Sequence, residues 1–325
     1  MKAKTKELYN ADKDFLDTFR KLSNVHGGWQ TWSDFVHLAA YAISNAVDPV
    51  HREQRESEYM KIISRYTEAE GQAHARLLAA TVEALEENPD QDFLGRIYMN
   101  LEMGNKYLGQ CFTPFDVCRM MAKINCPNLP EEIRKKGWVS VMDCCIGGGA
   151  MLIAFASECR AQKVDFQNHC LFVGQDIDHN VAMMAYIQLS LLGCPGYIVV
   201  GNALTEPLAG NVLYAPMERE TFITPMYCST AWTMRRAWHA LDVMMQTAPA
   251  AETAEIPESL PEAENAPTPE PISAAEEPTP EQVTLLPPII EANADPKKAS
   301  VPTYTVKRSR KEFAAAQISM FDGLE

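Results

Sequence analysis

One glycine-rich run in the middle of the chain limits the possible folds more than any other feature. The run DCCIGGG, from Asp143 to Gly149, follows a β-rich stretch at 138–143 and directly precedes the apolar stretch AMLIAF. Glycines at such a strand-to-helix turn let the backbone bend sharply and approach a ligand, and the helix N-terminus offers free N–H donors. The run therefore predicts a nucleotide-like cofactor above a parallel sheet.

The segments around this run alternate between two patterns. β-rich runs at 138–143, 171–178 and 197–204 are separated by helical patterns at 150–160 and 179–192. Strands separated by helix-length segments form βαβ crossovers and a parallel sheet. The predicted fold class is α/β, with a Rossmann-like core over 105–246 whose remaining strands are short or missing.

The first hundred residues follow a helical pattern and predict a helical N-terminal domain over 1–104. A T-x-x-D sequence at Thr31 predicts the start of one helix, and the apolar stripes are most simply core-forming faces. The stripes include Phe15, Leu16, Phe19, Leu22, Trp32, Phe35, Val36, Ala39, Ala40 and Ile43.

The last part of the chain has a different composition. From about residue 249, Pro, Glu, Ala and Thr dominate, and aromatic residues are almost absent until Tyr304. Such a segment buries too little apolar area to offset its chain entropy. We therefore predict a disordered tail over 247–325.

The net charge is unevenly distributed along the chain and does not exclude a nucleic-acid partner. The formal charge is −14, and residues 247–325 account for −8 of it, with 14 acids and 6 bases. The remaining −6 does not exclude a local basic groove.

Nine cysteines without a C-x-x-C pair indicate reduced core thiols rather than a metal or redox site. A polar N-terminus and the lack of an apolar stretch of about twenty residues indicate a cytoplasmic protein without a membrane span.

A second run supports an adenosine-containing cofactor. Asp176 ends the second β-rich stretch in the sequence GQDID, and a carboxylate there can accept hydrogen bonds from both ribose hydroxyls. NAD is a fair rival, but D-x-x-x-G-G-G departs from the G-x-G-x-x-G spacing of dinucleotide folds. The leading Asp143 also suits the positively charged amino group of a methionine moiety, so the two runs favour S-adenosylmethionine.

A third run lies upstream of the glycine loop. In the sequence LGQCFTP at 108–114, Thr113 is expected to cap a helix that begins at Pro114, with Asp116 completing a T-x-x-D box. Taken alone, this is most simply an ordinary helix start.

Together these runs resemble the N6-adenine DNA methyltransferases, particularly the modification subunits of type I restriction systems. In that family a G-x-x-[FY]-T-P run precedes the glycine loop, followed by a strand ending in an acid and a strand ending in G-[DN]. The matching residues are Phe112, Thr113, Pro114, Asp143, Gly147, Gly149, Asp176, Gly201 and Asn202. The resemblance covers about residues 105–208.

The resemblance implies a cofactor and a role for each part of its site. The glycine loop, which includes Cys145, would hold the methionine end of S-adenosylmethionine, and Asp176 the ribose. Ile177 would pack near the adenine, and Asn202 would reach the adenine edge. DNA is the implied substrate, with a specificity or complementing subunit as a further partner.

One family motif is absent from the sequence. These enzymes hold a flipped adenine with a [DNS]-P-P-[YF] tetrapeptide, and no such tetrapeptide occurs here. The nearest candidate, VLYAPM at 212–217, lacks the polar residue, the second proline and the following aromatic ring. Catalytic residues therefore cannot be named from the sequence.

The end of the tail carries a second resemblance. Its sequence QISMF is similar to the bacterial sliding-clamp-binding peptide, with the pattern Q-[LI]-[SD]-[LM]-F. A flexible tether could present such a peptide to an apolar pocket. The expected clamp-binding residues are Gln317, Ile318, Ser319, Met320 and Phe321. A basic cluster just upstream, from Lys307 to Lys311, is most simply a solvated charge run.

Three functions remain open at this point. The first is an S-adenosylmethionine-dependent adenine-specific DNA methyltransferase, incomplete or inactive alone. The second is a non-catalytic protein that binds cofactor or DNA and is recruited to replicating DNA, as a mobile genetic element would require. The third is a methyltransferase for a small molecule or protein, against which the Phe112-Thr113-Pro114 run argues.

Overall fold

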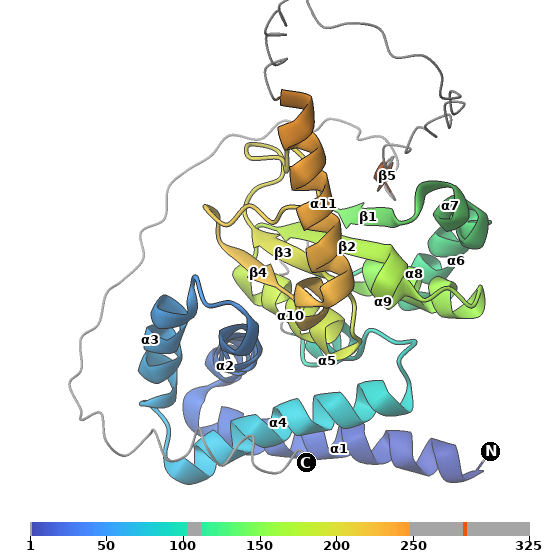
Figure 1. Cartoon of the computed structure of the whole chain (residues 1–325). Coiled ribbons are helices and arrows are strands. Elements are labelled where there is room, and N and C mark those ends of the chain that lie inside the picture. Colours follow the sequence, from blue (N-terminus) through green and yellow to red (C-terminus); the bar gives the residue numbers. More distant parts are fainter. Residues whose placement is uncertain (1, 103–111, 248–281, 285–325) are drawn as a thin grey trace, which may run out of the picture.

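Five strands form one mixed sheet, with helices gathered mainly on one of its faces (Figure 1). The structure is a computed structural model that describes residues 2–102, 112–247 and 282–284. The strands are β1 (Val139–Asp143), β2 (Cys170–Asp176), β3 (Gly196–Val200), β4 (Thr221–Ile223) and β5 (Gln282–Thr284). The helices are α1 (Lys2–His26), α2 (Gly28–Val47), α3 (Arg52–Ile63), α4 (Glu68–Glu87), α5 (Phe93–Asn100), α6 (Phe115–Asn125), α7 (Leu129–Lys136), α8 (Ala150–Ala161), α9 (Phe166–His169), α10 (His179–Leu191), the 3-10 helix η2 (Pro225–Cys228) and α11 (Thr230–Thr247).

The strand order is β4-β3-β2-β1-β5. β1, β2 and β3 pair in parallel, so that Asp143 lies beside Gly174 and Asp176 beside Val200. This confirms the predicted α/β class and the predicted parallel core, and it brings the carboxyl ends of the three strands to one edge. β4 runs antiparallel to β3, and β5 pairs in parallel with β1. The sequence analysis predicted neither of these two strands.

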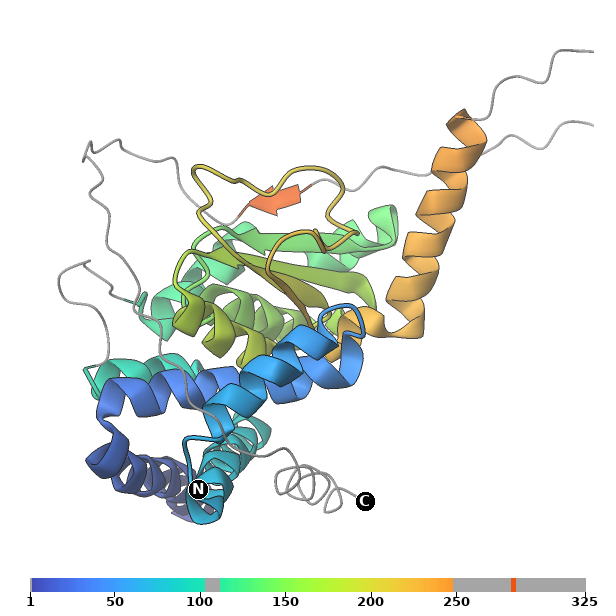
Figure 2. The same ribbon diagram turned by 90° about the vertical axis from the view of Figure 1, so that its left-hand side faces the viewer.

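The two faces of the sheet bury alternate residues of the central strands, as the period of two requires. Phe172 and Ile198 face α8 and α10 in the larger core. Leu171, Val173 and Tyr197 point to the opposite face, in a second cluster that includes Leu213, Tyr227 and Trp232. The second face is therefore covered by the loop after β3, by η2 and by the start of α11 (Figure 2).

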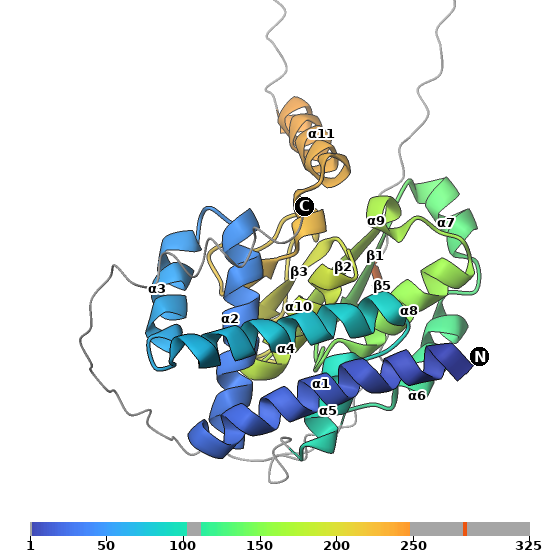
Figure 3. The same ribbon diagram turned by 90° about the horizontal axis from the view of Figure 1, so that it is seen from below.

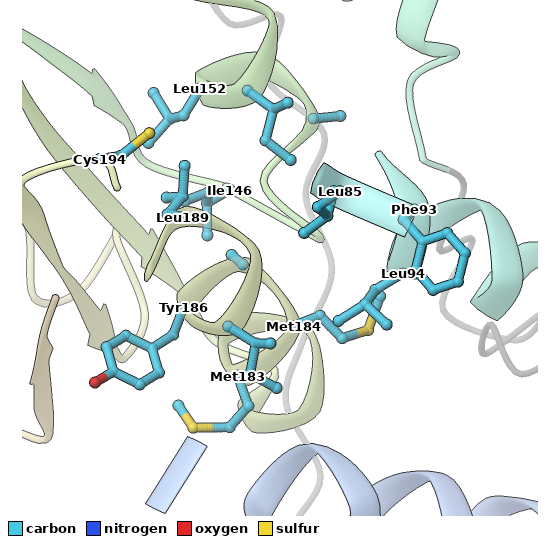
Figure 4. Close-up of a cluster of buried hydrophobic side chains, with 14 of the residues drawn as sticks. Leu85, Phe93, Leu94, Ile146, Leu152, Met183, Met184, Tyr186, Leu189 and Cys194 are labelled. Atoms are coloured by element: carbon cyan, nitrogen blue, oxygen red, sulfur yellow. The ribbon is translucent and has the colours of Figure 1, made fainter. Parts of the chain in front are cut away.

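The N-terminal helices and the Rossmann-like core share one continuous set of buried side chains. α1 and α4 lie side by side, and α2 lies against α10 (Figure 3). Figure 4 shows side chains of α4, α5, α8 and α10 meeting around Ile146 of the glycine loop. The division predicted at residue 104 stays a prediction, but the helices before it pack directly on the core.

A buried arginine ties α3 to the sheet. Arg55 donates from Nη1 to Oδ2 of Asp48 at 2.6 Å and from Nη2 to the carbonyl oxygen of Thr221 at 2.6 Å. Its guanidinium also lies 4.1 Å from the ring centroid of Phe222. Because both Arg55 and Asp48 are almost completely buried, this contact fixes α3 against β4.

Two predicted helix starts are wrong. α2 begins at Gly28, and Thr31 is fully buried inside it, so its hydroxyl caps nothing. α6 begins at Phe115 rather than Pro114, because Pro114 has an extended backbone (φ −54°, ψ 135°) and itself occupies the cap position. No side chain donates or accepts a cap hydrogen bond there, so the predicted T-x-x-D box does not form.

Most of the predicted tail lies outside the described residues, including the predicted clamp peptide and the basic cluster before it. Within that stretch, the structure describes only β5, a short strand containing Val283 and Thr284, which are strand-favouring residues. The described cysteines are free thiols, and most are buried, as expected of core residues. Among the described helices, none is both long enough and apolar enough to cross a membrane.

Candidate functional site

Hydrogen bonds join the segments at the carboxyl ends of β1, β2 and β3 along one edge of the sheet. The amide of Gly147 donates to Oδ2 of Asp176 at 2.8 Å, and the amide of Ile146 donates to the carbonyl oxygen of Gln175 at 3.0 Å. On the other side of Asp176, its carbonyl oxygen accepts from the amide of Gly201 at 2.8 Å. The glycine loop, the acid and the Gly-Asn pair therefore converge, as the motif order predicted.

Glycine is required at two positions of the loop. Gly149 has φ +96°, and a Cβ there would lie 3.3 Å from both Cα and Cβ of Ala185, so α8 could not approach α10 as closely. Gly147 has φ +53°, and a Cβ there would lie 3.5 Å from the ring of Phe112. Phe112 from the upstream run is therefore packed on the glycine loop.

Two carboxylates share this edge: Asp143 is buried and Asp176 is half-buried. Oδ1 of Asp143 accepts from the amide of Cys145 at 3.0 Å, and Oδ1 of Asp176 accepts from the amide of Asp178 at 2.9 Å. Burial raises the pKa of both carboxyls above the usual range, although these amides oppose the shift, and the charge of Asp176 raises the pKa of Asp143 further. A cation placed between them would be favoured by both. The edge therefore suits a ligand with positive charge.

The other predicted cofactor residues differ in their surroundings. Cys145 is exposed on the loop, and partial desolvation together with the neighbouring thiol of Cys144 raises the pKa of its thiol to about 11, so it stays neutral. Ile177 is 68% exposed directly after Asp176, which leaves an apolar surface beside the acid. Oδ1 of Asn202 accepts from the amide of Leu204 at 2.9 Å. Thr113 and Pro114 are exposed at the start of α6, and their side chains form no described contact with the glycine loop.

A buried polar network behind the loop was missed by the sequence analysis. Nε2 of Gln188 donates to the carbonyl oxygen of Gly148 at 2.8 Å and to Oδ1 of Asp92 at 2.8 Å. Oε1 of Gln188 accepts from the amide of Leu94 at 3.0 Å. The loop is thereby fixed to the start of α5. A glutamine inside the apolar run YIQLSL was the sequence signal that could have indicated this role.

A second residue that the sequence analysis missed is Tyr98, on α5. Its ring stacks on Phe112 with centroids 5.5 Å apart, and it is fully buried. Burial and the charge of Asp178 raise its pKa to about 12, so the hydroxyl remains a donor at neutral pH. In the described part of the chain, this hydroxyl has no hydrogen-bond partner. A buried donor without a partner is costly, and it fits a site that receives a polar ligand.

The same edge shows no equivalent of the base-binding tetrapeptide among the described residues. In the loop at 212–217, the hydroxyl of Tyr214 donates to the carbonyl oxygen of Arg236 at 2.9 Å, so this ring is held against α11. A proline and an aromatic ring also occur in Thr224-Pro225-Met226-Tyr227, but Oγ1 of Thr224 accepts from the amide of Gly196, the first residue of β3. That stretch therefore lies at the opposite edge of the sheet.

Comparisons with known proteins give one family match and some structural likenesses. The sequence model of the N-6 DNA Methylase family matches residues 89–249. Two solved structures resemble the chain: a candidate class I S-adenosylmethionine-dependent methyltransferase from Listeria monocytogenes (15% identity, TM-score 0.36, 66% of this chain and 58% of that chain), and the type I restriction-modification system methyltransferase subunit from Streptococcus thermophilus (16% identity, TM-score 0.33, 63% of this chain and 41% of that chain). The chain thus spans about half the length of these relatives.

No curated protein matches the chain. The family match begins just before α5 and includes both the glycine loop and Asp176. Residues 89–249 are therefore similar in sequence to the N-6 DNA Methylase family.

Proposed function

We propose that this chain binds S-adenosylmethionine at the carboxyl edge of β1, β2 and β3 and serves methylation of adenine in DNA. The observation that carries the proposal is the hydrogen bond from the amide of Gly147 to Asp176, which joins a left-handed glycine turn to an acid on the next strand. The family match adds DNA as the substrate class. When bound, the cofactor supplies a methyl group on a positively charged sulfur.

The residues of the edge have separate tasks in this proposal. The loop from Asp143 to Gly149, including Cys145, holds the methionine end, and the buried charge of Asp143 favours its amino group. Asp176 keeps acceptor capacity for ribose hydroxyls, because a carboxylate has about four lone-pair sites and the described contacts use two. Ile177 offers apolar contact to the adenine ring, and Asn202 faces its edge. Phe112 fixes the loop from the side, and Thr113 and Pro114 begin the helix that follows it.

A second candidate function is a cofactor-binding or DNA-binding protein without activity of its own. It is favoured by the position of Tyr214, whose hydroxyl is already bonded to α11, and by the placement of Thr224–Tyr227 at the opposite edge. A complementing or specificity subunit would then supply the groups that hold the base. Recruitment by the sliding clamp through Gln317–Phe321 stays a separate prediction.

The isolated chain is expected to bind S-adenosylmethionine but to methylate adenine in mixed DNA slowly or not at all. Positioning of a flipped base can supply many kcal/mol of barrier reduction, and the described edge lacks the groups for it. Calorimetric titration with the cofactor and its demethylated product, followed by a methyl-transfer assay, tests both parts. Absence of binding would refute the proposed function, whereas robust turnover by the chain alone would refute only its inactivity and point to the loop at 212–217.

Tyr98→Phe is expected to weaken cofactor binding by about 5- to 15-fold without lowering the melting temperature, because the hydroxyl lacks a partner within the described residues. Tyr186→Phe is the matched control, since the hydroxyl of Tyr186 is equally buried but donates to the carbonyl oxygen of Ile223 at 3.1 Å. That variant should lose stability and keep its affinity. Unchanged affinity in Tyr98→Phe would show that the cofactor does not bind this hydroxyl.

A further inference from the structure

Helix α11 carries a stripe of large apolar side chains that the described structure leaves open to solvent. Met244 and Val243, which lie on other sides of the helix, are 68% and 43% exposed. On one side, Trp238 is 65% exposed and Met245 is 63% exposed, with Met234 and Leu241 at 50% and 45%. Large exposed apolar stripes are unusual on soluble proteins and mark interaction surfaces. These four side chains are called the α11 stripe below.

The opposite side of α11 is fixed to the body of the protein, so the stripe cannot turn inward. Nε1 of Trp232 donates to the carbonyl oxygen of Gln167 at 2.8 Å, and Trp232 is fully buried. Two turns later, His239 contacts both Tyr214 and Asn211 through its ring nitrogens. Beyond this anchor, α11 projects from the sheet with no other described helix or strand beside its outer turns (Figures 1 and 2).

The spacing of the stripe identifies the kind of surface that would cover it. Met234, Trp238, Leu241 and Met245 are separated by four, three and four residues. This is the alternating spacing of the a and d positions in a heptad repeat, which forms the narrow seam of a helix–helix pair. A flat surface or a sheet would not match it as well as another helix with the same repeat.

We propose that α11 pairs in antiparallel orientation with α11 of a second copy of this chain. Around a two-fold axis, Trp238 of one copy faces Leu241 of the other, and Met234 faces Met245, because both pairings share one register. The seam is therefore self-complementary along its whole length. This interface is independent of the cofactor and of the proposed activity.

Charge complementarity supports the second copy and the orientation. In the same register, the flanking heptad positions bring Arg235 of one copy beside Asp242 of the other, and the symmetry forms this pair twice. Asp242 is exposed. The guanidinium of Arg235 stacks on Trp232, 4.6 Å from the ring centroid, and its Nη1 is buried without a partner among the described residues, so in the pair this group turns outward to meet Asp242. In a parallel pair, Arg235 would instead face Thr230 and Asp242 would face Ala237, and neither of these partners carries a charge.

The full-length chain is therefore expected to be a dimer, with twice the monomer mass of 36.3 kDa by light scattering after gel filtration at micromolar concentrations. Trp238→Glu or Leu241→Glu should return it to the monomer mass, because each places two carboxylates in the apolar seam. Trp29→Glu is the matched control, since Trp29 is 49% exposed on α2, and it should leave the dimer intact. A wild-type monomer, or a Trp238→Glu dimer, would overturn the proposal.

A charge exchange tests the orientation and separates a second copy from another partner. Arg235→Glu and Asp242→Arg should each raise the dimer dissociation constant about 5- to 10-fold, because each homodimer then carries two like-charge pairs. An equimolar mixture of the two variants should form heterodimers about as tight as the wild type, because both pairs regain opposite charges. Failure of the mixture to recover dimers, with each variant folded by circular dichroism, would overturn antiparallel pairing.

Discussion

Asp176→Ala is expected to weaken binding of S-adenosylmethionine by about 10- to 150-fold. The substitution removes a charge-assisted acceptor for the ribose, and it also leaves the amides of Gly147 and Asp178 without the carboxylate that now accepts from them. The loss therefore combines a missing ligand contact with a loosened glycine loop. Calorimetric titration measures it as a change in the dissociation constant.

Two controls separate these contributions. Asp176→Asn keeps one carbonyl acceptor of the same size, so its affinity should lie between those of the wild type and the alanine variant. Asp165→Ala removes an acid that accepts from the amide of Asn168 at the start of α9, away from the site, and should leave affinity unchanged. If Asp176→Ala bound the cofactor as well as the wild type, Asp176 would not belong to the site.

Arg55→Met is expected to lower the free energy of unfolding by about 3 to 5 kcal/mol, because it leaves the buried carboxylate of Asp48 without its charged partner. The carbonyl oxygen of Thr221 also loses its donor. Thermal and denaturant unfolding followed by circular dichroism measure the change. The control is Arg76→Met, because Arg76 and its partner Asp14 are both partly exposed, so its loss should cost only about 1 kcal/mol or less. Equal losses of unfolding free energy in both variants would contradict the claim that burial of the Arg55–Asp48 pair causes the larger loss.

The loss in Arg55→Met should also shrink on acidification. Burial alone would raise the pKa of Asp48, but the hydrogen bond from His51 and the charge of Arg55 lower it below the usual value. In the wild type, this carboxylate therefore adds stability above the unfolded pKa, and that stability is lost as the pH falls through the lowered value. Without Arg55 the pKa of Asp48 rises. On acidification, Asp48 is therefore protonated at a higher pH in the variant than in the wild type, which removes its unpaired buried charge. The difference between the two proteins should be largest near neutral pH and smaller below about pH 4.

The parallel core could be predicted because its signals are local. The stretches at 138–143, 171–178 and 197–204 became β1, β2 and β3, and the patterns at 150–160 and 179–192 became α8 and α10. Each combines β-branched or apolar residues with a clear period and a glycine or acid at its end. β4 and β5 are each only three residues long, too short to show a period, and their pairing depends on distant parts of the chain. The start of α2 was misplaced because burial of Thr31 outweighed its preference for a cap position.

The sequence predicted the strand-end residues of the candidate site but not the residues that pack behind them. Glycines and acids at strand ends have a recognisable order, so Gly147, Gly149 and Asp176 were identified from the motif alone. Gln188, Asp92 and Tyr98 support the same loop from behind. Gln188 bonds Gly148 and Asp92, which lie 40 and 96 positions away in the sequence. A single buried polar side chain in an apolar helix indicates that a partner exists, but its spacing does not identify that partner.

The hydrogen-bond network of Gln188 limits where recombination could divide this domain. Asp92 lies in the stretch that composition assigns to the helical region, yet its carboxylate accepts from the glutamine that also holds Gly148. A recombination event with its crossover between α5 and α6 would separate these groups and leave a buried donor and a buried acid unmatched in the descendant. Selection should therefore keep α5 with the glycine loop, and the exchangeable evolutionary unit begins before Asp92.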